Sequence, residues 1–184
     1  MKNLTLLLSA LIVLVLVISG CEQDNSINDP VSVQKPADGV SAIYNNSSLS
    51  KLSNETLVEL SRVRAATAKY HNMDKAIEDG YADINVYEEH MGWHYLKADF
   101  LDAEFDMEKP ELLVYAPWPN GELKLVAVEY AVPHALSADP PEGFTGTQDV
   151  WNLEPPPFDL WTLHAWVWYN NPDGIFEPFN PRVD

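Results

Sequence analysis

Apolar residues follow two different periods along the chain, a helical one first and an alternating one afterwards. In residues 54–70 they recur at helical spacing behind Ser53, a residue type that favours the N-cap position. Asn72 offers a second cap for the segment 73–79, and Gly80 favours the left-handed conformation in which many helices end. The pattern therefore predicts two helices joined by a tight corner.

Beyond these helices the period changes to two, which is typical of β-strands. Aromatic and β-branched residues alternate with others in four segments, 93–100, 111–117, 122–133 and 158–169. Asn120-Gly121 lies between two of them and is a strong signal for a β-hairpin, whereas the proline-rich residues 134–157 predict an irregular loop. Helices followed by strands predict an α+β fold, with the helix pair packed on an antiparallel sheet or a partly closed barrel.

The first fifty residues show neither period, and they predict two further parts. Residues 1–20 combine a positive start with a short apolar run and small residues, as in a secretory signal peptide. Residues 21–50 are rich in Asn, Asp, Ser and Pro and have too few apolar residues to offset the entropy of ordering, so we expect a flexible polar tether. The single globular domain is then expected over residues 51–184.

The end of the apolar run has a more specific pattern. Ile18-Ser19-Gly20-Cys21 resembles the lipobox of bacterial lipoproteins. The resemblance implies that the signal is cut before Cys21, the only cysteine, and that a lipid on this residue holds the protein on a membrane. We therefore expect an extracytoplasmic place in the bacterial cell envelope, at the outer membrane in a Gram-negative cell. The alternatives are a plain signal peptide with a chance cysteine, or a short membrane anchor.

Composition excludes several classes of function. With 28 acidic and 11 basic side chains the net charge is −17, which argues against nucleic acid as a partner. One cysteine excludes an internal disulfide framework and a Cys-based zinc cluster. The chain has no serine in a nucleophile elbow and no glycine-rich phosphate loop, so no catalytic motif is recognisable. Six acidic residues lack the spacing of a calcium loop and predict a solvated face: Asp99, Asp102, Glu104, Asp106, Glu108 and Glu111.

Three predicted strands each place one titratable residue on an apolar face, namely His94, Glu129 and His164. A buried carboxylate without a partner is costly, so Glu129 should meet a cation, a metal ion or a hydrogen-bond donor. Strand by strand, the expected neighbours on these faces are Leu96 and Ala98; Leu123, Leu125, Ala127 and Ala131; and Leu160, Thr162, Trp166 and Trp168.

The same three residues admit several interpretations. Two imidazoles and a carboxylate suit a divalent metal such as zinc, copper or iron, with positions left open for water or ligand. A buried polar pair that only stabilises the core is one alternative, and a small-ligand pocket lined by aromatic residues is another. The candidates for such a lining are Trp93, Tyr95, Trp166 and Trp168.

These interpretations of His94, Glu129 and His164 give three hypotheses about function. The first hypothesis is a lipid-anchored binding protein for a metal ion or a small ligand. The second is a metal-dependent envelope enzyme that uses the same residues, with Glu129 as general base. The third is a structural or interaction module of the envelope that has no pocket.

Four segments, KYHNMDKAIEDGY, MGWHYL, LVAVEYAVP and LHAWVWYNNPDGIFEPFNP, resemble an uncharacterised family of secreted bacterial proteins. That family has a GYHY-like stretch, a VEY strand and an HxWxW strand that ends in NPxGxFxPxNP. The resemblance covers most of residues 63–181 and includes His94, Glu129 and His164, while Trp93 stands where the family often has Tyr. It implies one secreted domain and no particular activity.

Overall fold

The computed structural model describes Tyr44 and residues 49–184. The predicted signal peptide, Cys21 and most of the predicted tether lie outside these residues, so what we expect of them stays a prediction. Within the described part of the chain, no helix has the length and apolar character needed to cross a membrane.

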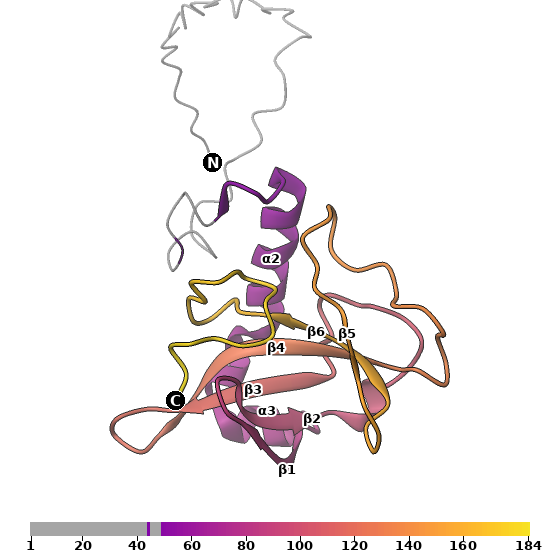
Figure 1. Ribbon diagram of the computed structural model, residues 1–184. Coiled ribbons are helices and arrows are strands. Elements are labelled where there is room, and N and C mark those ends of the chain that lie inside the picture. The colour runs from indigo at the N-terminus through magenta and orange to yellow at the C-terminus, as the bar shows by residue number, and fades with distance from the viewer. Residues whose placement is uncertain (1–43, 45–48) are drawn as a thin grey trace, which may run out of the picture. The chain divides into compact units, whose positions relative to one another are not determined.

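Two capped helices open the described domain, as the sequence predicts (Figure 1). Helix α2 (Asn54–Thr67) begins at Ser53, whose hydroxyl accepts a hydrogen bond from the backbone N–H three residues later at 3.1 Å. It continues through the 3-10 helix η2 (Ala68–His71) to Asn72, which caps α3 (Met73–Glu78) with its side-chain oxygen at 3.0 Å.

Gly80 ends α3 in the way its position in the sequence predicts. Its φ of 100° lies in the left-handed region that favours glycine. The N–H groups of Gly80 and Tyr81 donate to the carbonyls of Ile77 and Ala76, both at 3.0 Å, and satisfy the end of the helix.

Six antiparallel strands follow the helices in one sheet, so the predicted α+β fold is confirmed. Their order across the sheet is β1-β2-β3-β4-β6-β5, and every neighbouring pair is antiparallel. In chain order the strands are β1 (Ala82–Glu88), β2 (Gly92–Leu96), β3 (Leu112–Pro117), β4 (Leu123–Pro133), β5 (Asn152–Glu154) and β6 (Leu160–Ala165).

The strand boundaries differ from the predicted ones at several places. The predicted strand 93–100 ends at Leu96, because the chain turns into the 3-10 helix η3 (Ala98–Phe100), and Ala98 is therefore not on the face of His94. The predicted strand 158–169 ends at Ala165. Strand β5 lies inside the predicted irregular loop, and β1 was not predicted as a strand.

Strand β6 ends at Ala165 because the backbone that follows bonds to β4 instead of continuing the pairing. The N–H groups of Trp168 and Tyr169 both donate to the carbonyl of Val126 in β4, at 3.2 and 3.0 Å. The alternation of side chains along β6 therefore does not reach Trp168.

A bulge in β4 changes the predicted faces of that strand. Ala127 and Leu125 pair with successive residues of β3, so Val126 is an extra residue and reverses the alternation. Glu129 and Ala127 lie on one face, whereas Leu125 and, by the same alternation, Leu123 lie on the other. The prediction that these two leucines share the face of Glu129 is therefore wrong.

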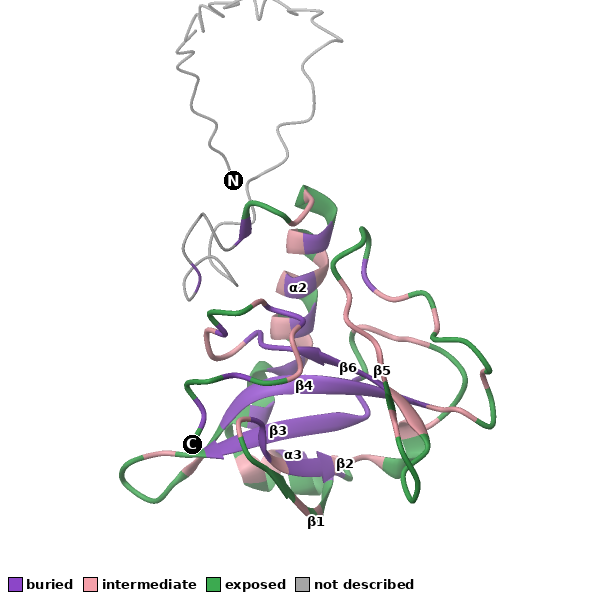
Figure 2. Cartoon of the chain, viewed as in Figure 1, coloured by how far each residue is buried: buried purple, intermediate pink, exposed green. Residues whose placement is uncertain are grey.

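The helices cover one face of the sheet and leave the other to the candidate site. The Tyr115 hydroxyl donates to the carbonyl of Tyr70 at 2.7 Å, and the ring of Tyr70 packs edge-on against Tyr81. Figure 2 shows the central strands β3 and β4 almost wholly buried and the edge strand β1 largely exposed. The sheet is curled, so that its two edge strands, β1 and β5, line the same cavity.

Glu111 does not belong to the predicted solvated face. It is buried, and its carboxylate accepts a hydrogen bond from the backbone N–H of Ala131 at 3.0 Å. Burial raises the pKa of Glu111 to about 8. It stabilises the sheet at a site separate from that of Glu129.

Candidate metal centre

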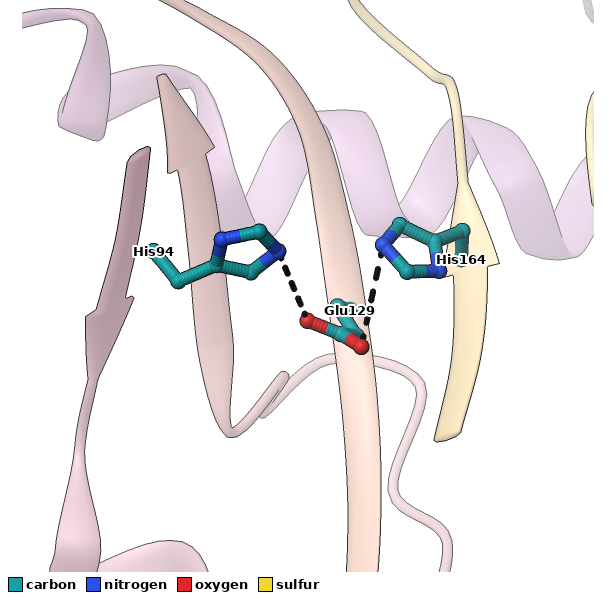
Figure 3. A group of neighbouring side chains, drawn as sticks. All are labelled: His94, Glu129 and His164. Atoms are coloured by element: carbon teal, nitrogen blue, oxygen red, sulfur yellow. Dashed lines mark ion pairs between the residues drawn. The ribbon is translucent and has the colours of Figure 1, made fainter. Parts of the chain in front are cut away.

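Three strands bring His94, Glu129 and His164 together on the face that points away from the helices (Figure 3). Glu129 in β4 pairs directly with His164 in β6. His94 lies in β2, in register with Ala127 of β4 through an intervening residue of β3. The two imidazoles therefore approach the carboxylate from opposite sides.

The distances within this group are short and uniform. The Nε2 atom of His94 lies 3.4 Å from Oε2 of Glu129, and Nε2 of His164 lies 3.6 Å from Oε1. One ligand atom from each residue can be chosen so that all three lie within 4.8 Å of one another. All three side chains are buried, so the group could hold a metal ion shielded from solvent.

Hydrogen bonding determines which nitrogen of His94 faces the site. Its Nδ1 lies 3.3 Å from the carbonyl of Val86, which can only accept, so Nδ1 carries the proton in the neutral ring. Nε2 then turns a lone pair toward the oxygen of Glu129. Two lone pairs at this distance repel unless a proton or a metal ion lies between them.

His164 has even fewer partners. Among the described residues, neither of its ring nitrogens has a hydrogen bond, although the side chain is only 2% exposed. A buried polar atom without a partner costs about 1–3 kcal/mol. A metal ion bound at Nε2 would satisfy one of these atoms.

Burial also sets the protonation of the group. It raises the pKa of the Glu129 carboxyl, an effect that the neighbouring His164 partly offsets. It lowers the pKa values of both histidines. Both shifts of the histidines favour the neutral imidazole that ligates metals, and a bound cation would offset the cost of ionising the buried Glu129.

A cavity of about 370 Å³ opens on this group. His94, Glu129 and Thr162 contribute to its lining, while His164 does not. An ion held by the three residues would thus have protein on one side and the cavity on the other.

The aromatic residues proposed from the sequence do not line this cavity. Trp93 and Tyr95 alternate with His94 and lie on the opposite face, where Tyr95 packs against Tyr115. Trp168 lies over Arg64, at 4.0 Å from its guanidinium carbon to the ring centre. The placement of Trp93, Tyr95 and Trp168 in the pocket is therefore corrected.

Trp166, the fourth aromatic residue proposed for the pocket, does not line the cavity either. It is fully buried, and its ring stacks on that of His164 with centroids 6.3 Å apart and an interplanar angle of 17°. Phe158 and Phe179 do line the cavity, and both lie in irregular segments of the structure, although Phe158 is the first residue of the predicted strand 158–169. Sequence reasoning missed them, together with Glu88 and Glu154 at the edges of the sheet.

No protein family matches the chain, and neither the curated proteins nor the solved structures contain a match. The resemblance to a secreted bacterial family and the lipobox therefore stay predictions. Any proposal about function depends on the geometry of the site.

Proposed function

We propose that the protein binds one divalent metal ion, zinc, copper or iron, through Nε2 of His94, Nε2 of His164 and the carboxylate of Glu129. We propose further that a lipid on Cys21 holds this metal-binding domain on the extracytoplasmic side of a bacterial membrane. Two imidazoles and one carboxylate are a donor set that these metals accept.

The spacing of the donor atoms is the observation that supports the metal site best. Ligands in a tetrahedral site with bonds of about 2.1 Å lie about 3.4 Å apart, close to the 3.4 and 3.6 Å between each imidazole and Glu129. Direct charge-assisted hydrogen bonds are shorter, at about 2.7–2.9 Å. The two imidazole–carboxylate distances, each to a different oxygen of Glu129, thus fit an ion between the side chains better than direct pairing, and one donor atom of each residue lies within 4.8 Å of the other two.

Metal titration of the purified protein tests the proposal. After treatment with EDTA and its removal, zinc, copper and ferrous iron are titrated in turn and followed by calorimetry, with elemental analysis of the product. We expect one ion per chain and a loss of affinity of at least about a hundredfold in His164→Gln, because one ligand is removed.

His134→Gln is the matched control. His134 is a half-buried histidine that pairs with Asp159 at 3.1 Å away from the site, so its variant should bind as the wild type does. Absence of binding in the wild type, or equal binding by both variants, would contradict the proposal.

The open side of the site favours metal-dependent catalysis as a second candidate function. Three protein ligands leave room for a metal-bound water, and the cavity would bring a substrate to it. Zinc-dependent hydrolysis of a p-nitrophenyl ester, lost in Glu129→Gln and retained in His134→Gln, would support this candidate. Equal rates with and without zinc would argue against it.

A further inference from the structure

The cavity beside the candidate metal centre is larger and more apolar than a metal ion requires. At about 370 Å³ it falls within the size range of small-molecule pockets. Phe158 and Phe179 in its lining remain 48% and 50% exposed, so their rings are accessible to a ligand. The apolar part of the lining includes Ile84, Leu96, Leu112, Leu160, Phe158 and Phe179.

Charge in the cavity has one sign. Glu88 at the end of β1 and Glu154 at the end of β5 line it from the two edges of the curled sheet, and the described residues that line it include no lysine or arginine. In the described part of the chain, neither carboxylate has an ion pair or a side-chain hydrogen bond of its own, and Glu154 also raises the pKa of Glu129 at the floor. Such a cavity disfavours anions and attracts cations.

One buried hydroxyl in the lining is only weakly bonded. The hydroxyl of Thr162 lines the cavity and makes no hydrogen bond of normal geometry within the described residues, and its weak interaction with Glu129 partly offsets the rise in the pKa of that carboxyl. Polar atoms in this state are costly, and a bound ligand or water commonly satisfies them.

We propose that the cavity binds a small molecule with an apolar body and a positively charged amine, with the amine between Glu88 and Glu154 and the body against the apolar walls. This inference extends the proposed function, since the ligand would share the cavity with the metal site. The contacts with the apolar walls and the two carboxylates do not themselves require the metal.

Calorimetry with three probes of equal chain length tests the proposal. Octylamine, octanol and octanoate are titrated into the purified protein in EDTA and, separately, with zinc. We expect octylamine to bind about tenfold more tightly than octanoate in EDTA. The two carboxylates at the mouth attract the positively charged amine and repel the negatively charged octanoate. The preference should shrink in high salt, since exposed charges are screened.

Three variants complete the test. The double variant Glu88→Gln and Glu154→Gln should bind octylamine and octanoate about equally, whereas the matched double variant Glu104→Gln and Glu142→Gln, at exposed sites outside the cavity, should keep the wild-type preference. Ile84→Trp, which fills the cavity from the edge strand β1, should weaken the binding of all three probes.

Several results would overturn the inference. The first is that octylamine does not bind, and the second is that octanoate binds as tightly as octylamine in EDTA. The third is that the preference for octylamine persists when both Glu88 and Glu154 are replaced. Failure of the zinc titration with normal octylamine binding would overturn only the metal proposal. Zinc binding without octylamine binding would overturn only the proposal of an amine-binding cavity.

Discussion

Replacing Glu129 with leucine separates a metal ligand from a purely structural partner. The carboxyl is buried, burial raises its pKa, and its contacts with the two histidines are 3.4 and 3.6 Å long. Leucine has a similar volume and removes the cost of burying a polar group. In EDTA we therefore expect Glu129→Leu to lose no stability, and to gain up to about 2 kcal/mol.

Zinc should make the wild type more stable than Glu129→Leu, the reverse of their order in EDTA. At a free concentration of a hundred times Kd, a ligand that binds only the folded state adds about 2.7 kcal/mol. For a domain of this size that corresponds to a rise in Tm of about 10 °C. The wild type should show this rise and Glu129→Leu should not, in thermal melts followed by circular dichroism.

A structural role gives the opposite result in EDTA. If Glu129 only pairs with the histidines, removing it breaks a buried pair and costs about 3–5 kcal/mol. A loss of this size, together with no effect of zinc on the wild type, would refute the metal site.

Glu111→Leu is the matched control for this experiment. Glu111, the residue before β3, is also a buried glutamate, but its carboxyl accepts from the backbone N–H of Ala131. Its loss should cost about 1–3 kcal/mol in EDTA, because the N–H loses its partner. The response to zinc should remain that of the wild type.

Three further predictions concern other parts of the chain. Cys21→Ser should leave uncleaved precursor and no lipid on the protein, as read by membrane fractionation and mass spectrometry; normal processing would contradict the lipobox. Tyr44→Phe should lower the free energy of unfolding by about 1–2 kcal/mol in urea, because the hydroxyl donates to the carbonyl of Trp166 at 3.1 Å and accepts from the N–H of Asn171 at 3.0 Å. The pKa of Glu111 is about 8 in the folded protein and 4.5 as its ordinary value, so the folded state holds the extra proton and stability should fall by about 3.5 kcal/mol as pH rises from about 5 to about 8. Glu111→Gln should flatten this dependence, and an unchanged slope would show that another group causes it.

The parts of the fold that short segments determine could be predicted from the sequence. Ser53, Asn72 and Gly80 act on backbone groups within a few residues, and the structure has their caps where the sequence places them. Four of the six strands follow from alternation. The end of β6 could not be predicted, because it depends on backbone hydrogen bonds with Val126, which is distant in the chain. Strand β5 could not be predicted because its three residues are too few to show alternation.

The candidate site shows the same division. Glu129 could be identified because the alternation holds from Ala127 onward, even though the bulge at Val126 makes the first half of the predicted face wrong. The cavity could not be identified, because Phe158 and Phe179 reach it from irregular segments and Glu88 and Glu154 reach it only through the curl of the sheet.

The curl of the sheet relates the buried Glu129 and His94 to the acidic residues at the two edges of the sheet. A flat sheet would leave β1 and β5 far apart, on opposite sides of Glu129. Curling brings the acidic ends of both edges over one cavity, whose floor contains Glu129 and His94. A domain that needed only a stable core would gain from a leucine at position 129, because a buried carboxyl with long contacts costs free energy. A cation at the floor and a second positive charge at the mouth would offset that cost, and this is why the proposed metal and amine sites are best tested on the same set of variants.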